Sequence, residues 1–198
     1  MTRGLLALAI TLALLGAPAA HADAPDAQAV ATARHLLIAL RVLSYDKRLA
    51  DRSPGPAVTI ALVYSPTDAG RQQRADLEAG FALIPKVKVG GRTVKVVAIE
   101  AATDKALTRS LVAAAPTAVI VADDLGERMP SLRAATRTAS ALSFSWRETD
   151  IASGISVGIV AGREHDQIVI NLDASRAEGV RFGAGLLQLA RIVDGASR

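Results

Sequence analysis

Few residues in this chain have side chains that could do chemistry. Its 198 residues include three histidines and no cysteine. The lack of cysteine excludes thiolate metal sites, redox centres and cysteine nucleophiles. His35 and His165 are isolated in the sequence, so they are not spaced to share a metal ion. Since the chain also has no H-E-x-x-H or G-x-S-x-G motif, the sequence predicts no catalytic residue, no metal and no other cofactor, and thus a protein that is not an enzyme.

The polar residues that could bind a small ligand follow two predicted strands. Tyr64, Ser65 and Thr67 come at the end of one strand, and Asp123 and Asp124 follow a later one. In open parallel sheets, ligands bind outside the carboxyl ends of the strands, where the strand order reverses. These five residues are therefore the candidate ligand-binding site. The two carboxylates also fit a cation site, a helix cap or a solvated loop.

Apolar periodicity places these residues in an alternation of strands and helices. The expected helices are residues 24–49, 69–83, 104–114, 129–139 and 183–193, and the expected strands are residues 57–64, 93–99, 117–121, 141–146, 156–161 and 167–172. Residues 51–56 are expected to form a turn or linker. This alternation predicts the α/β class: a three-layer Rossmann-like sandwich with a mainly parallel sheet and a C-terminal antiparallel hairpin at one edge.

The C-terminal third carries local signals with structural roles. Asn171 ends a strand, where its amide can tie a turn to the backbone. Asp173 is expected to cap a short helical turn that Gly179 closes in the left-handed conformation. In the last expected helix, we predict that Leu186 or Leu187 is more than about 90% buried, as core leucines often are.

The first 22 residues resemble a cleavable secretory signal peptide. Arg3 makes the amino end positive, an apolar run follows over residues 5–15, and Ala20-His21-Ala22 has the small-x-small pattern of a cleavage site. The run is shorter than the roughly 20 residues that span a bilayer. We therefore expect a signal peptide at residues 1–22 and a single periplasmic domain at residues 23–198.

Charge and aromatic content argue against a nucleic-acid partner. The formal net charge is +4, the basic residues are scattered along the chain, and aromatic residues make up only 3% of it. A nucleic-acid-binding arm would show a block of lysine and arginine, and a base-stacking surface would need more aromatic side chains.

Several stretches of the second half resemble the YfiR-like family of periplasmic proteins. Residues 91–96 (Gly-Arg-Thr-Val-Lys-Val) resemble the family's GGR-x-V-x-V stretch, and residues 153–160 resemble its GG-x-I-x-F strand. The best match is residues 170–180, which resemble F-x-I-N-x-x-A-A-x-x-A-G-L. Residues 186–190 (Leu-Leu-Gln-Leu-Ala) resemble its LL-x-LA ending. The resemblance covers about residues 90–193.

This resemblance implies a regulator that binds the periplasmic sensor domain of a membrane signalling protein, in the best-known case a diguanylate cyclase. The chain departs from the family at residues 41–46, where relatives usually have aromatic residues and a Trp-Pro, and it lacks the cysteine pairs of several relatives. A small-molecule-binding module, similar to one lobe of a substrate-binding protein, is the alternative. A homodimer is also compatible with the sequence.

Overall fold

The computed structural model describes residues 26–162 and 165–193. They form one eight-stranded sheet with the order β2-β3-β1-β4-β5-β6-β7-β8. The strands are β1 (Ala57–Tyr64), β2 (Lys88–Val89), β3 (Arg92–Glu100), β4 (Ala118–Val121), β5 (Leu142–Ser145), β6 (Val157–Val160), β7 (Gln167–Asn171) and β8 (Arg191–Val193). The five central strands from β3 to β6 are parallel, as the α/β pattern predicts.

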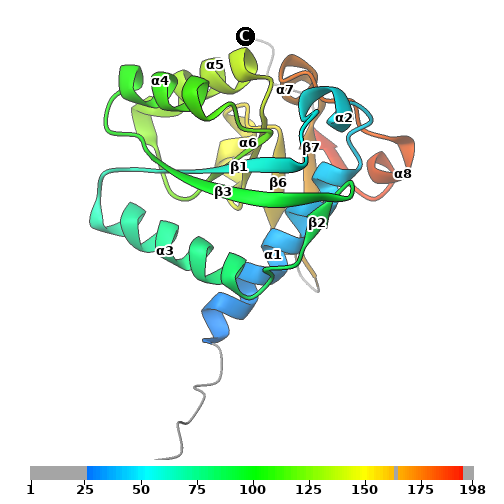
Figure 1. The fold of residues 1–198 in the computed structure, drawn as a ribbon, viewed down its shortest axis with the longest axis horizontal. Helices are drawn as coiled ribbons and strands as arrows, with labels where there is room; N and C mark the ends of the chain where they lie inside the picture. The colour runs from blue at the N-terminus through cyan, green and yellow to red at the C-terminus, as the bar shows by residue number, and fades with distance from the viewer. Residues whose placement is uncertain (1–25, 163–164, 194–198) are drawn as a thin grey trace, which may run out of the picture.

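Helices cover both faces of this sheet and complete the predicted three layers (Figure 1). In that view α4 (Asp104–Ala114) and α5 (Met129–Ala139) lie above the sheet, and α1 (Ala27–Ser44) and α3 (Asp68–Ala82) lie below it. The remaining helices are short: α2 (Leu49–Arg52), η1 (Gly126–Arg128), α6 (Glu148–Ala152), α7 (Leu172–Ala177) and α8 (Ala184–Leu187).

Strand β1 shows how the sequence builds both halves of the core. Successive side chains of a strand point to opposite faces of the sheet. Val58, Ile60 and Leu62 join the apolar cluster beneath α1 and α3, whereas Ala61 and Val63 join the cluster beneath α4 and α5. Because both faces are covered, the strand is an almost unbroken apolar run rather than an alternating one.

The two edges of the sheet are antiparallel additions. Gly90 and Gly91, with φ of 55° and 79°, form the tight turn that pairs β2 with β3. At the other edge β6 and β7 form the predicted antiparallel hairpin. An additional strand, β8, then pairs in parallel with β7 and becomes the outermost strand. The sequence patterns did not predict β2, β8 or the short helix α6.

Two expected helices are wrong in extent. The first ends at Ser44 and is followed by the separate α2, which includes part of the stretch expected to be a linker. The last spans only Ala184–Leu187, because residues 191–193 pair instead with the free edge of β7. Leu186 is nevertheless 1% exposed, as predicted, while Leu189, expected on the same apolar stripe, is 73% exposed.

Short polar side chains cap several of the helices, and the backbone predicted for Gly179 is confirmed. Thr67 and Thr103 accept hydrogen bonds from Gly70 N and Ala106 N and so cap α3 and α4. Asn171, not Asp173, caps α7: its Oδ1 accepts from Ala174 N at 3.0 Å. Gly179 has the expected left-handed backbone, with φ of 77°.

No helix in residues 26–162 and 165–193 is long and apolar enough to cross a membrane. The expected signal peptide at residues 1–22 lies outside the described residues. The single domain expected from residue 23 onward stays a prediction.

A buried carboxyl group lies under the C-terminal end of α7. Glu178 is 2% exposed, and its Oε2 accepts hydrogen bonds from the backbone N–H of Ser143, at 2.9 Å, and from the Ser156 hydroxyl. Burial raises the pKa of Glu178 above its usual 4.5, and the hydrogen bonds from Ser156 and Ser143 only partly oppose this. The carboxyl therefore links β5 to the residue before β6, and its burial makes its charged form less favourable than that of an exposed carboxyl.

Replacing Glu178 with glutamine should make the protein more stable at neutral pH. An acid whose pKa is raised by folding takes up a proton on folding, so the free energy of unfolding falls as pH rises from about 4.5 to the raised pKa. The advantage of Glu178→Gln over wild type should thus grow across that window and then stay level. Urea unfolding at a series of pH values measures it. The exposed Glu127→Gln is the control, and a difference independent of pH would contradict the prediction.

Candidate functional site

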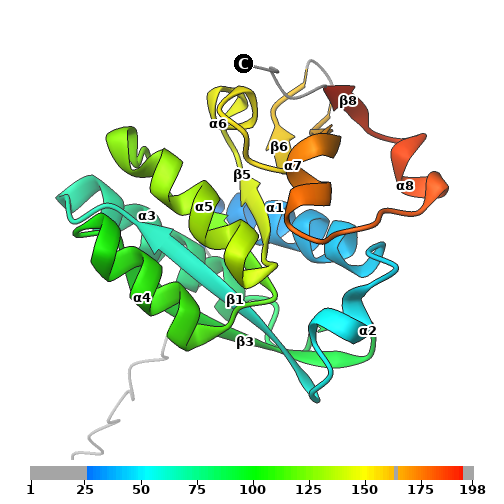
Figure 2. The ribbon, with the colours of Figure 1, turned by 90° about the horizontal axis from the view of Figure 1, so that it is seen from above.

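The carboxyl ends of β1 and β4 meet at the point where the strand order reverses. Strand β1 pairs in parallel with β3 on one side and with β4 on the other, so two crossover connections diverge there. Helices α3 and α5 lie on opposite faces of the sheet (Figure 1), and Figure 2, seen from above, shows both of them beside β1. This arrangement brings together Ser65 and Asp123, which are 58 residues apart in the sequence.

Ser65 and Asp123 bind each other directly. Asp123 Oδ1 accepts from the backbone N–H of Ser65 at 2.8 Å, and Asp123 Oδ2 accepts from the Ser65 hydroxyl. The Ser65 and Thr67 hydroxyl oxygens are 2.7 Å apart. Thr67 in turn accepts from Gly70 N at 3.0 Å. Three of the five candidate residues therefore form one hydrogen-bonded group at the start of α3.

Gly70 allows α3 to begin directly against this group. A Cβ atom at position 70 would lie 2.4 Å from the Ser65 carbonyl oxygen and 2.9 Å from Asp123 Oδ2. Such contacts are far inside van der Waals distance, so only glycine fits there. The start of α3 therefore packs directly against Ser65 and Asp123 at Gly70.

Asp124 and Tyr64 lie next to this group with partners of their own. Asp124 Oδ1 accepts from Gly126 N at 2.8 Å and lies 3.6 Å from the Arg147 guanidinium. The Tyr64 ring faces Arg74 of α3, with the guanidinium carbon 5.5 Å from the ring centroid. Tyr64 is therefore joined to α3 rather than to Asp123.

Arg147 is a member of this region that the sequence patterns did not indicate. It follows β5, the next strand along the sheet, and donates to the Asp123 carbonyl oxygen at 3.1 Å. It also forms an ion pair with the buried Asp150 at 2.8 Å. The only available signal was its position, since Arg147 follows a buried strand just as Ser65 and Asp123 do.

The polar side chains of this region are bound to one another. Both carboxylate oxygens of Asp123 already accept hydrogen bonds, and no group of three or more His, Asp or Glu side chains in residues 26–162 and 165–193 could hold a metal ion. His35 lies elsewhere, with its Nε2 3.3 Å from Asp166 and its ring 5.7 Å from the Trp146 ring. His165 lines a separate cavity of about 660 Å³.

A groove with an apolar lining lies between α1 and α8. Its volume is about 330 Å³, and it is lined by Leu37, Ile38, Arg41, Val42, Tyr45, Ile168, Leu186 and Leu189. Leu37 and Leu189 are 45% and 73% exposed. Arg41 is the one charged residue of this set, and its guanidinium carbon lies 5.5 Å from the Tyr45 ring centroid. Large apolar side chains thus gather at the surface on both sides of one depression.

Solved structures similar to this chain show the same fold at low identity. They include an ABC domain in complex with L-Trp from Streptococcus pneumoniae, with 12% identity and a TM-score of 0.51 over 77% of this chain and 62% of that one. A conserved domain protein from Vibrio cholerae has 16% identity and a TM-score of 0.57 over 81% of this chain and 59% of that one. The third is the open, ligand-free structure of a substrate-binding protein with adhesive properties from Clostridium difficile. It has 12% identity and a TM-score of 0.52 over 75% of this chain and 58% of that one.

The chain spans less than two thirds of the length of each of these three proteins. Among curated proteins, none matches the sequence. A family model described as YfiR/HmsC-like (DUF4154) matches residues 51–191, which include all eight strands except the last two residues of β8. This match covers well over half of the chain and agrees with the motifs at residues 91–96 and 170–180. The chain belongs to the YfiR/HmsC-like family.

Proposed function

We propose that this chain is an exported, non-enzymatic regulator that binds the periplasmic sensor domain of an inner-membrane signalling protein, for example a diguanylate cyclase. Membership in the YfiR/HmsC-like family supports a periplasmic regulatory role in broad terms. Export would depend on the signal peptide expected at residues 1–22. The regulator would act by occupying or releasing its partner, so it needs a surface for another protein rather than a reaction centre.

The observation that carries this proposal is the apolar groove between α1 and α8. Apolar side chains gathered on a surface mark a protein-binding site when they form one patch. Leu37 and Leu189 are exposed, while Leu186 beneath them is buried. The base of the groove is therefore part of the apolar core, and its edges are exposed. An apolar side chain from the partner would enter the groove and displace water, as anchor residues do at protein interfaces.

The charges around the groove add selectivity. Arg41 lines the groove, whereas the charge of Arg34, two turns earlier on α1, is balanced by Asp166 at 3.2 Å. No lining residue of the groove in the described part of the chain is acidic. A partner segment with an apolar anchor and a nearby carboxylate would complement this surface.

Replacing Leu189 with serine should weaken partner binding more than about tenfold, because an apolar anchor pocket at an interface carries a large share of the binding energy. Leu189 is 73% exposed, so the variant should fold as wild type does. A photocrosslinker at position 189 in intact cells, read by mass spectrometry, identifies the inner-membrane partner. Titration of its purified periplasmic domain then measures the dissociation constants of wild type and variant.

The matched control is Val112→Ser, which replaces another exposed apolar residue, on α4 on the opposite face of the sheet. It should bind the partner domain as wild type does. Equal loss of affinity in both variants would contradict the proposed surface. Crosslinks that join position 189 only to proteins without a membrane segment would contradict the proposed partner class.

A ligand-binding module remains the second candidate function. The solved structures with this fold include a complex with L-Trp and a substrate-binding protein. The residues that we propose for a ligand are Tyr64, Ser65, Thr67, Asp123 and Asp124, at the switch point of the sheet. A ligand there would have to replace the Ser65–Asp123 hydrogen bonds. Ligand-dependent changes in the amide NMR signals of Ser65 and Gly70 would favour this function over the first.

A further inference from the structure

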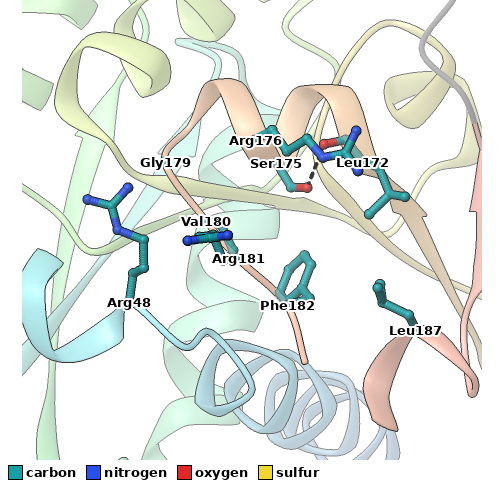
Figure 3. Close-up of a pocket in the computed structure, with 9 residues that line it drawn as sticks. All are labelled: Arg48, Leu172, Ser175, Arg176, Gly179, Val180, Arg181, Phe182 and Leu187. Carbon is teal, nitrogen blue, oxygen red and sulfur yellow. Dashed lines mark hydrogen bonds between the residues drawn. The ribbon is translucent and has the colours of Figure 1, made fainter. Parts of the chain in front are cut away.

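A second cavity, with a cationic lining, lies beside the end of α7 (Figure 3). Its volume is about 570 Å³, within the range of small-molecule sites. Nine residues line it: Arg48, Leu172, Ser175, Arg176, Gly179, Val180, Arg181, Phe182 and Leu187. Three of these described residues are arginines and none is acidic. The arginines come from three segments: the residue before α2, helix α7 and the chain after α7.

A buried carboxylate holds two of the arginines side by side. Asp46 Oδ1 accepts from the backbone N–H groups of Arg48 and Arg181, both at 3.0 Å. Its other oxygen, Oδ2, pairs with the buried Arg52 guanidinium at 2.9 Å. The charge of Asp46 is thus balanced by Arg52. Asp46 positions the backbones of Arg48 and Arg181, and the side chains of these two arginines line the cavity.

The carboxylates near the cavity are weak partners for its arginines. Arg48 lies 3.9 Å from Asp51, and Arg176 lies 3.7 Å from Asp173, with all four side chains at least half exposed. Ion pairs at such positions contribute little because water and salt screen them. Among the ion pairs of residues 26–162 and 165–193, none includes Arg181. The guanidinium groups are therefore available to an anion.

The opposite wall of the cavity is apolar. In Figure 3, Arg48 and Arg181 lie on one side, while the Phe182 ring and the Leu187 side chain lie on the other. Ser175 does not offer its hydroxyl hydrogen to the cavity, because it donates to the Leu172 carbonyl at 2.9 Å. A bound molecule would meet Arg48 and Arg181 at one end and an aromatic and aliphatic surface at the other, while Arg176 lies beside Leu172 in Figure 3.

We infer that this arginine pocket binds a small organic anion, with its carboxylate or phosphate group between Arg48 and Arg181 and its apolar body against Phe182 and Leu187. Guanidinium groups suit both anions, because their planar N–H donors match two oxygens at once. Leu187 lines this pocket, whereas Leu186 and Leu189 line the apolar groove. The inference does not require a protein partner.

Isothermal titration of the full mature protein at constant ionic strength tests the inference. The probes are phenyl phosphate, phenylacetate and the neutral 2-phenylethanol. At least one of the two anions should bind with one-to-one stoichiometry, and the alcohol should bind much more weakly. The stronger anion identifies the head group. Equal binding of the alcohol, or no binding of either anion, would overturn the inference.

Arg48→Gln and Arg181→Gln should each raise the dissociation constant of the more tightly bound anion roughly tenfold, as expected for the loss of a charge-assisted hydrogen bond. Both side chains are exposed, and both variants keep the backbone N–H that Asp46 accepts. Arg109→Gln, an exposed arginine on α4, is the matched control and should bind as wild type does. If the three variants bind equally, general charge attraction explains the binding and the pocket assignment is wrong.

The amide NMR signals of Gly179 and Phe182 provide a readout that does not depend on the substitutions, and they should shift on binding.

Discussion

Replacing Asp46 with alanine should lower the free energy of unfolding by about 3–5 kcal/mol, the usual cost of removing one partner of a buried ion pair. The Arg52 and Asp46 side chains are 5% and 0% exposed, and their Nε and Oδ2 atoms are 2.9 Å apart. Without Asp46, the buried Arg52 charge would keep only carbonyl partners, Thr117 O at 3.3 Å and Ser140 O. The backbone N–H groups of Arg48 and Arg181 would also lose their acceptor.

Urea unfolding of Asp46→Ala, Asp46→Asn and Asp51→Ala measures this effect. Asp51 forms only an exposed pair with Arg48, so its removal should cost less than about 1 kcal/mol. Asp46→Asn keeps an oxygen for the two N–H groups and loses the charge. Its free energy of unfolding should therefore lie between those of Asp46→Ala and Asp51→Ala. An Asp46→Ala protein as stable as Asp51→Ala would show that the buried pair does not hold these segments together.

The second large effect is expected at the C-terminal end of the chain, where Leu186→Ala should cost about 2–5 kcal/mol through lost burial and the cavity left behind. Leu186 is 1% exposed and belongs to the same apolar cluster as Leu43 of α1 and Ile170 of β7. Helix α8 has only four residues, Ala184–Leu187, and cannot be stable without this contact. The loss would be a large part of a typical total stability of roughly 5–15 kcal/mol.

Leu187→Ala is the control for this prediction, because Leu187 is only half-buried at the arginine pocket. Its urea midpoint should change less than that of Leu186→Ala. The cellular level of the Leu186→Ala protein should also fall, since a less stable protein is degraded faster. Equal midpoints for Leu186→Ala and wild type would exclude Leu186 from the core.

Local sequence signals account for much of the fold because their causes are local. Thr67 and Thr103 cap α3 and α4 through bonds to N–H groups three residues away. Gly179 ends a turn with a backbone that only glycine adopts readily. The apolar run of β1 required two covered faces. The chirality and order of βαβ units then place the ends of β1 and β4 together, so Ser65 and Asp123 could be grouped before their contact was known.

The C-terminal segment shows what local patterns leave open. Its leucines fit an amphipathic helix, and the sequence predicted one over residues 183–193. The structure ends the helix at Leu187 because the edge of β7 offers unpaired backbone groups to residues 191–193. Leu189 then lies outside the helix and at the surface. Residues 191–193 form a strand because β7 lies beside them. The periodicity of apolar residues carries no information about such a neighbouring strand.

Both candidate binding surfaces also depend on contacts between distant residues. The sequence by itself determined the α/β class and the polar residues at the strand ends, since the strand and helix patterns and the strand order fix these. Only the tertiary structure placed Arg181 beside Arg48, because Asp46 accepts from a backbone N–H 135 residues later. It likewise brought Leu37 and Leu189 to the lining of one apolar groove. The residues of each pair are far apart in the sequence and come together only when the core is packed. No short stretch of sequence therefore predicts these pairs.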